Sequence, residues 1–223
     1  MSEQTQCLIE GIAAPLPFDN LDTDQIMPKQ FLLGIDKTGL ARGVLHDLRF
    51  DGDGQPRPEF VLNRPAYQGA KILLAGANFG CGSSREHAVW GLKQAGFEAV
   101  IAPSFGEIYY FNALNNRLLV ITLAPAQVAE LMAYADTAAA PVLTIDVLAR
   151  QVRTADGKIY SFDMPERQQR MFIDNLDTLG MTLRDAAAIT AFEQRHYSAN
   201  PWLKIDLPAQ RKGAVSAAIT PPP

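Results

Sequence analysis

Residues 71–90 read KILLAGANFGCGSSREHAVW, which predicts a strand, a glycine-rich loop and the start of a helix. The apolar run 72–75 is typical of a buried parallel strand. Three glycines follow, and Ser83 with Glu86 three residues later fits a capping box that would begin a helix near Ser84. Such a loop presents free backbone N–H groups and the positive end of a helix dipole. The stretch therefore predicts an anion site.

The familiar phosphate loops do not fit this stretch. The dinucleotide-binding fingerprint requires a small residue where Arg85 stands, and the Gly-Lys-Ser/Thr of a Walker A motif is absent. The hydroxyls of Ser83 and Ser84 and the Arg85 guanidinium favour a site that binds and acts on a carboxylate or a phosphate. On the local pattern alone, the alternative is that Ser83 only caps the helix and the glycines only turn the chain.

Composition narrows the class of protein. Of 223 residues, 48% are hydrophobic and 20% are charged, which suits a globular domain, alone or with a tail. The net charge of −4 indicates no basic face for nucleic acid. The first residues lack the pattern of a signal peptide, and no apolar run approaches about 18 residues, so we expect a cytoplasmic protein without a membrane partner.

The cysteines and histidines predict no metal site in this chain. Two cysteines, Cys7 and Cys81, are no disulfide framework, and a zinc site or an iron–sulfur cluster would need three or four suitably spaced ligands. We interpret Cys81 as a packing residue of the loop. We interpret His87 as packing under the helix start, with the orientation of a partner residue as the alternative.

A second polar cluster, at residues 19–26, reads DNLDTDQI. Three aspartates within six residues raise the question of calcium, but registers starting at Asp19 or Asp22 lack the required glycine and glutamate of an EF-hand loop. Two interpretations stay open: a solvated turn whose aspartates cap the local backbone, or a carboxylate that points into a site. Residues 28–50 are expected to form a substantial loop with short helices, of the kind that often carries specificity.

The rest of the chain alternates between strands and helices. Strands are expected at 7–12, 60–63, 72–75, 99–102, 118–123 and 142–147, a hairpin at 151–162, and helices at 84–94, 105–115, 125–135, 165–174 and 182–193. This rhythm predicts an α/β fold with a parallel sheet covered by helices, and a site beyond the carboxyl ends of the strands. Residues 204–223 contain few large apolar side chains and end in three prolines, so we expect a disordered tail.

These residues together resemble a known family. NFGCGSSREHA at 78–88 resembles the swivelling domain of the aconitase superfamily. The segments DNLDTDQI, PKQFL, FVLN, APSF and LDTLGMTL resemble those of the small-subunit family of bacterial 3-isopropylmalate dehydratases. The resemblance covers about residues 7–203. It implies a three-layer β/β/α swivelling domain over residues 1–203, with a largely parallel central sheet.

The resemblance also implies an activity. Such a hydro-lyase interconverts 2-isopropylmalate and 3-isopropylmalate, by dehydration to isopropylmaleate and rehydration, in leucine biosynthesis. The small subunit would act only in a heterodimer with a large subunit, whose cysteines bind a [4Fe–4S] cluster, and would itself bind no cofactor. Departures from the family pattern at residues 115–117 and 164–167 keep one alternative open, a related hydro-lyase of the methylmalate, citraconate or homoaconitate type. A separate alternative is a non-catalytic anion-binding subunit.

The resemblance assigns the base to Ser83, which would remove the proton next to a substrate carboxylate. A serine is weakly acidic, so it would act as an alkoxide stabilised by the helix N-terminus, by loop amides such as that of Gly82, and by Arg85. Ser84 and Arg85 would bind the substrate carboxylate, Arg85 through a bidentate pair.

Two further residues receive roles from the resemblance. Asp24 would face the site and orient or pair with a histidine or arginine of the partner subunit. Lys29, together with the loop 30–42, would set substrate specificity.

Overall fold

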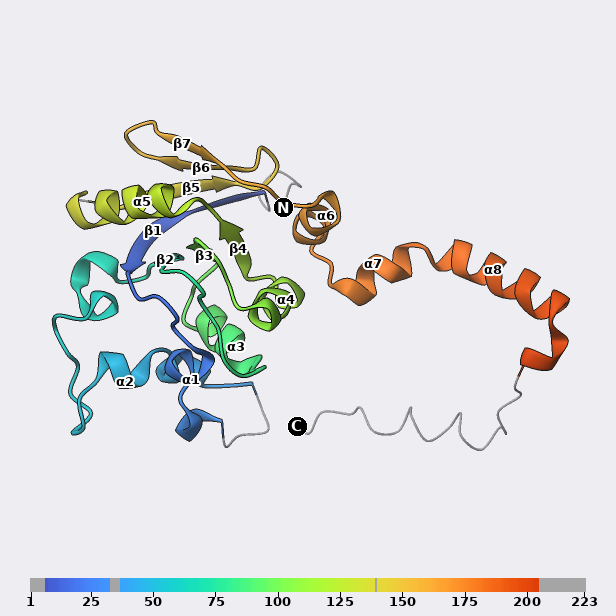
Figure 1. The fold of residues 1–223 in the computed structure, drawn as a ribbon, viewed down its shortest axis with the longest axis horizontal. Coiled ribbons are helices and arrows are strands. Elements are labelled where there is room, and N and C mark those ends of the chain that lie inside the picture. Colours follow the sequence, from blue (N-terminus) through green and yellow to red (C-terminus); the bar gives the residue numbers. More distant parts are fainter. Residues whose placement is uncertain (1–6, 33–36, 139, 205–223) are drawn as a thin grey trace, which may run out of the picture. The chain divides into compact units, whose positions relative to one another are not determined.

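The computed structural model describes residues 7–32, 37–138 and 140–204 of the chain. The chain forms two compact units, Met1–Thr178 and Leu179–Pro223 (Figure 1). The tail predicted to be disordered lies, apart from Lys204, outside the described residues. The single domain expected over residues 1–203 therefore stays a prediction.

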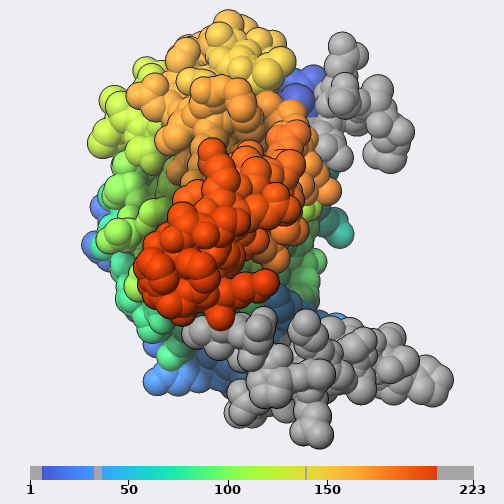
Figure 2. All heavy atoms as spheres, turned by 90° about the vertical axis from the view of Figure 1, so that its right-hand side faces the viewer, coloured from blue at the N-terminus to red at the C-terminus, as the bar shows by residue number. Residues whose placement is uncertain are grey.

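A seven-stranded sheet, in the order β4-β3-β2-β1-β5-β6-β7, forms the framework of the first unit (Figure 1). Its strands are β1 (Leu8–Leu16), β2 (Ile72–Ala75), β3 (Ala99–Ala102), β4 (Leu119–Thr122), β5 (Val142–Asp146), β6 (Gln151–Thr154) and β7 (Ile159–Ser161). β1 to β4 pair in parallel, and β5 to β7 continue beyond β1 as an antiparallel meander. β6 and β7, gold in Figure 2, form one end of this unit.

The α/β class with a parallel central sheet is confirmed, but one strand runs opposite to the expected direction. β5 pairs antiparallel with residues 8–12 of β1. Its burial alternates, with Leu143 and Ile145 buried and Thr144 and Asp146 half-buried, whereas β2 and β3 are buried throughout. That alternation is typical of an antiparallel strand with one covered face, and it is visible in the sequence.

Two other strand predictions differ from the structure. β1 does not end before Pro15 but continues to Leu16. Its pairing with β5 ends at Ile12, so the missing N–H of Pro15 lies where β1 has a strand on one side only. The strand expected at 60–63 is instead a single helical turn, because its backbone bonds locally and not to a neighbouring strand.

Helices cover both faces of the parallel strands. α3 (His87–Gln94) and α4 (Glu107–Asn115) share one core with alternate strand residues such as Leu73 and Val100. α5 (Pro125–Thr137) shares the other core with Ile72 and Ile101. Both faces of these strands are therefore buried, which accounts for their continuous apolar sequences. Loops, and not the helices of either layer, follow directly after the carboxyl ends of β1 and β2.

Short helices connect β1 to β2, and longer ones follow β7. The connection contains α1 (Thr23–Ile26), η2 (Lys29–Phe31), η3 (Leu40–Gly43), α2 (His46–Arg49), η4 (Val61–Asn63) and η5 (Pro65–Tyr67). The second unit contains α7 (Thr178–Arg184), which begins at the boundary, α8 (Ala186–Ala199) and η6 (Pro201–Leu203), where one helix was expected at 182–193. Among the described residues, no helix is both long and apolar enough to cross a membrane.

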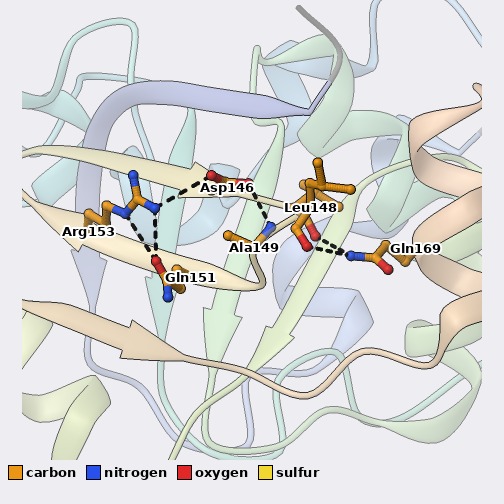
Figure 3. A network of polar contacts seen from close by, with 7 residues as sticks. Asp146, Leu148, Ala149, Gln151, Arg153 and Gln169 are labelled. Atoms are coloured by element: carbon orange, nitrogen blue, oxygen red, sulfur yellow. Dashed lines mark hydrogen bonds and ion pairs between the residues drawn. The ribbon is translucent and has the colours of Figure 1, made fainter. Parts of the chain in front are cut away.

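The buried side chain of Gln169 fastens α6 (Glu166–Ile173) to the turn between β5 and β6 (Figure 3). Its amide nitrogen donates to the carbonyl oxygens of Val147 and Leu148, at 2.7 and 3.0 Å. Its amide oxygen accepts from Arg150 at 3.1 Å. One side chain thus satisfies two backbone acceptors and orients a guanidinium.

We predict that Gln169→Leu lowers the free energy of unfolding by about 1–3 kcal/mol, because the two carbonyl groups lose their shared donor. Urea unfolding followed by circular dichroism measures this change. The matched control is Arg167→Leu on the exposed side of the same helix, which should change stability by less than about 0.5 kcal/mol. Equal effects of the two substitutions would show that Gln169 does not hold the helix.

Candidate active site

Two loops from distant parts of the sequence meet at one edge of the sheet. Residues 76–86 follow β2, and residues 17–22 follow β1. Because β1 and β2 are parallel neighbours, their carboxyl ends lie at the same edge. The predicted location of the glycine loop, beyond the carboxyl ends of the strands, is confirmed.

Backbone hydrogen bonds fasten these two loops together. The Gly80 N–H donates to the Leu21 carbonyl at 2.8 Å, and the Thr23 N–H donates to the Cys81 carbonyl at 2.9 Å. Asp22 and Cys81 form an isolated parallel β-bridge between them. The DNLDTDQI segment therefore has a fixed position relative to the serines.

An aromatic cluster supports the glycine loop. The Tyr109 ring is buried and meets Phe79 edge-on at a centroid distance of 5.3 Å, with Phe105 stacked at 6.4 Å. Gly80 has φ +72°, and a Cβ there would lie 2.2 Å from the Tyr109 ring. Glycine is therefore required both for the backbone conformation and for the close approach. Burial raises the pKa of the Tyr109 phenol well above its ordinary value.

The three aspartates of the DNLDTDQI segment have separate partners. Asp19 accepts from a backbone N–H of the glycine loop at 2.6 Å. Asp22 caps α1 by accepting from the Gln25 N–H at 2.7 Å. Asp24 forms an ion pair with Arg85. Both interpretations of this segment are thus partly realised: one aspartate caps the local backbone, and another reaches the serine–arginine loop.

The predicted capping box of Ser83 and Glu86 is wrong. α3 begins only at His87, and no side chain caps its N-terminus. The Glu86 carboxylate accepts instead from the side-chain amide of Asn116, which follows α4. The Ser83 hydroxyl lies 3.1 Å from the hydroxyl of Thr23. Tertiary partners have therefore replaced the local cap, and the helix dipole is farther from Ser83 than the sequence indicated.

Backbone donors near Ser83 remain available. Within the described chain, no hydrogen bond uses the N–H groups of Gly82, Ser83 or Ser84. Gly82 has φ +90°, which favours glycine. Successive amides in such a turn form a concavity suited to an anion. These amides fit the predicted role of loop donors.

The Arg85 guanidinium is held from within the chain. Its Nη1 forms an ion pair with Asp24 Oδ1, and the Arg85 and Asp24 side chains are 24% and 43% exposed. In the described residues, no hydrogen bond uses Nε or Nη2 of Arg85. The edge formed by these two nitrogens is the one that grips a carboxylate side-on, so Asp24 can orient Arg85 without occupying that edge.

The other predicted residues are less closely connected to this cluster. Lys29 is exposed in η2, and residues 33–36 of the expected specificity loop lie outside the described residues. The Cys81 thiol donates to the carbonyl of Asn20 at 3.4 Å. The His87 ring packs 4.6 Å from the Trp90 ring. Among the described residues, no three His, Cys, Asp or Glu side chains gather as metal ligands would.

One residue of this site was not singled out from the sequence. Thr23 is 1% exposed, and its hydroxyl contacts both the carbonyl and the hydroxyl oxygen of Ser83. In the sequence it reads as an ordinary member of an acidic turn. Only the tertiary contact identifies it.

Comparison with known proteins agrees with this geometry. Residues 5–126 match the family model of the aconitase C-terminal domain, and residues 180–206 match that of the C-terminal domain of the 3-isopropylmalate dehydratase small subunit. A curated relative from Chromobacterium violaceum, named 3-isopropylmalate dehydratase small subunit 1, is 59% identical over 88% of this chain and 92% of its own length.

More distant relatives agree with this match. The 3-isopropylmalate dehydratase small subunit of Roseobacter denitrificans is 46% identical over 87% of this chain and 97% of its own. The crystal structure of a 3-isopropylmalate dehydratase from Methanocaldococcus jannaschii is 27% identical, with a TM-score of 0.59 over 83% of this chain and 99% of that one. The chain therefore belongs to the family of 3-isopropylmalate dehydratase small subunits, in the aconitase superfamily.

Proposed function

We propose that this chain is the small subunit of a hydro-lyase that interconverts 2-isopropylmalate and 3-isopropylmalate in leucine biosynthesis. Relatives with that name match this chain over nearly their whole length. The observation that carries the proposal is the meeting of Ser83, Arg85 and Asp24 at one edge of the sheet. A base, a carboxylate-binding guanidinium and an orienting carboxylate are among the groups that this reaction needs.

The geometry supports the following proposed roles for the site residues. Arg85 binds a substrate carboxylate along its free edge, while Ser84 and the loop amides contribute further donors. Ser83 Oγ takes the proton from the carbon beside that carboxylate, the C–O bond at the neighbouring carbon breaks, and the electron pair of the C–H bond forms the alkene. Return of water with the two carbons exchanged gives the isomer. Ser83 is needed in both directions, because the proton must be returned.

The site in this chain is only half of what the reaction needs. Ser83 and Ser84 are exposed, so water must be excluded by another surface. The chain has two cysteines, which do not supply the three or more thiolates of a [4Fe–4S] cluster. We assign the cluster to a large subunit, where it would supply a Lewis acid for the departing hydroxyl group. The cytoplasmic location expected from the sequence remains a prediction.

Asp24 holds Arg85 in this proposal. The family resemblance implied that Asp24 orients or pairs with a histidine or arginine of the partner subunit, and its second carboxylate oxygen can accept from such a residue. The Asn115-Asn116-Arg117 departure has a structural explanation, because Asn116 accepts from Trp90 at 3.0 Å and donates to Glu86. It gives no reason to prefer a citraconate or homoaconitate substrate.

The purified chain should turn over no isopropylmalate and show no cluster absorbance. Co-expression with a large subunit, followed by anaerobic cluster reconstitution, should give turnover that is fastest with 2-isopropylmalate in a panel containing citramalate and homocitrate. The assay follows the ultraviolet absorbance of the alkene. Turnover by the chain on its own would contradict the proposal that it supplies only half of the active site. A preference for another diacid would identify the enzyme as a related hydro-lyase.

Ser83→Ala in the reconstituted enzyme should lower kcat by about 10²- to 10⁴-fold, the contribution typical of a general base. The melting temperature of the chain should change little, because Ser83 is exposed. Ser84→Ala is the matched control: it removes a hydroxyl one residue away, and the proposal expects it to raise KM more than it lowers kcat. Retained kcat in Ser83→Ala would remove the base assignment.

Arg85→Lys should lower kcat/KM about 10- to 100-fold, although the charge is kept. A lysine cannot form the two parallel hydrogen bonds of a guanidinium edge, and a charge-assisted bond contributes about 1.5–3 kcal/mol. Steady-state kinetics measure the change, with the exposed Arg64→Lys as control. Unchanged kinetics would mean that the substrate carboxylate binds elsewhere.

A further inference from the structure

The hydroxyl of Thr23 lies between two oxygen atoms of Ser83. It is 3.0 Å from the carbonyl oxygen and 3.1 Å from the side-chain hydroxyl. Thr23 is 1% exposed, and its own N–H and carbonyl are bonded to Cys81 and Met27. A threonine buried this completely, with a β-branched side chain that restricts χ1, holds its hydroxyl in one place.

The number of protons decides how these groups bond. A hydroxyl has one proton to donate and two lone pairs that accept. When Thr23 donates to the carbonyl of Ser83, it can still accept the proton of the Ser83 hydroxyl. In this arrangement Ser83 is neutral, and its O–H points at Thr23.

Loss of the Ser83 proton changes this balance. The hydroxyl oxygens of Thr23 and Ser83 are 3.1 Å apart and repel each other when no proton lies between them. A negative charge on Ser83 Oγ increases this repulsion. Rotation of the Thr23 O–H from the carbonyl to Oγ supplies the missing donor. The carbonyl of Ser83 tolerates the loss, because it also accepts the Arg85 N–H at 2.8 Å.

We propose that Thr23 is a positioning residue for Ser83: its hydroxyl accepts from neutral Ser83 and donates to the alkoxide, turning between two acceptors already within reach. The inference rests on the proposed role of Ser83 as the base. Thr23 touches neither substrate nor cofactor and acts only through Ser83. A hydrogen bond to an ionised acceptor is stronger than one to a neutral acceptor, so Thr23 favours the charged form.

Thr23→Val tests this in the reconstituted two-subunit enzyme, because valine keeps the shape and removes the hydroxyl. We expect kcat to fall about 10- to 100-fold, the value of one charge-assisted hydrogen bond, with KM nearly unchanged. The limb of the kcat–pH profile that reports ionisation of the base should move to higher pH, because the alkoxide loses a donor. Thr23→Ser, which keeps the hydroxyl, should recover most of the activity.

Thr154→Val is the matched control. Thr154 is also buried, at 6% exposure, and its hydroxyl also bonds locally, to Asp156 and Lys158 in the β6–β7 hairpin. Its loss should lower the melting temperature and leave kcat and the pH profile unchanged. Thr23→Ala is the second variant if valine does not fold, and it is compared with Thr23→Ser in the same way.

A double-mutant cycle with Ser83→Ala decides the result. If Thr23 acts through Ser83, Thr23→Val adds no further loss of kcat once Ser83 is alanine. Additive losses of kcat in the double mutant would overturn the inference about Thr23. So would a fall in kcat in Thr23→Val with an unchanged pH profile and no recovery in Thr23→Ser. In both cases Ser83 could still be the essential base. Full activity of Ser83→Ala itself would overturn the proposed base, and the inference with it, so the two failures are distinguishable.

Discussion

The parallel pairing of β1 with β2 is the constraint on which the site depends. It brings the carboxyl ends of two strands, separated by more than fifty residues of chain, to one edge of the sheet. The loops that follow are then joined by the bonds from Gly80 to Leu21 and from Thr23 to Cys81. If this pairing slipped, Asp24 and Thr23 would no longer meet Arg85 and Ser83. A rigid scaffold with functional loops at its carboxyl edge is the general arrangement of α/β enzymes.

The sequence predicted correctly those features that depend on residues close together along the chain. The continuous apolar runs indicated the buried strands, and the position of Ser83 and Arg85 beyond β2 followed from strand order. The start of α3 was not predicted correctly. Ser83 and Glu86 have the spacing of a cap, but Asn116 and Thr23 compete for the same groups. Capping is worth about 1 kcal/mol, which tertiary partners easily exceed.

Other features required information that one sequence holds only weakly. The alternation of Leu143 and Ile145 with polar residues does indicate an antiparallel strand with one covered face. The alternating order of helices and strands nevertheless favoured a parallel strand there. The pairing of Asp24 with Arg85 joins residues sixty-one positions apart, and no spacing rule connects them. Thr23 is harder still, because nothing in its composition or periodicity separates it from a turn residue; its role follows only from burial and from two distances.

On the proposed function, these contacts would keep the site organised before a partner subunit covers it. A solvent-exposed arginine ordinarily samples many rotamers, and ordering it on binding would cost affinity. Here Asp24 fixes Arg85, while the buried hydroxyl of Thr23 fixes Ser83, and both supports lie in the first turn of α1, directly after the loop that follows β1. On the proposed function, the chain would bring preorganised groups to its large subunit, which would exclude water and supply the other half of the chemistry. The Asp24–Arg85 pair is half-buried and its two contacting atoms are shielded from solvent, so it holds the guanidinium in one orientation.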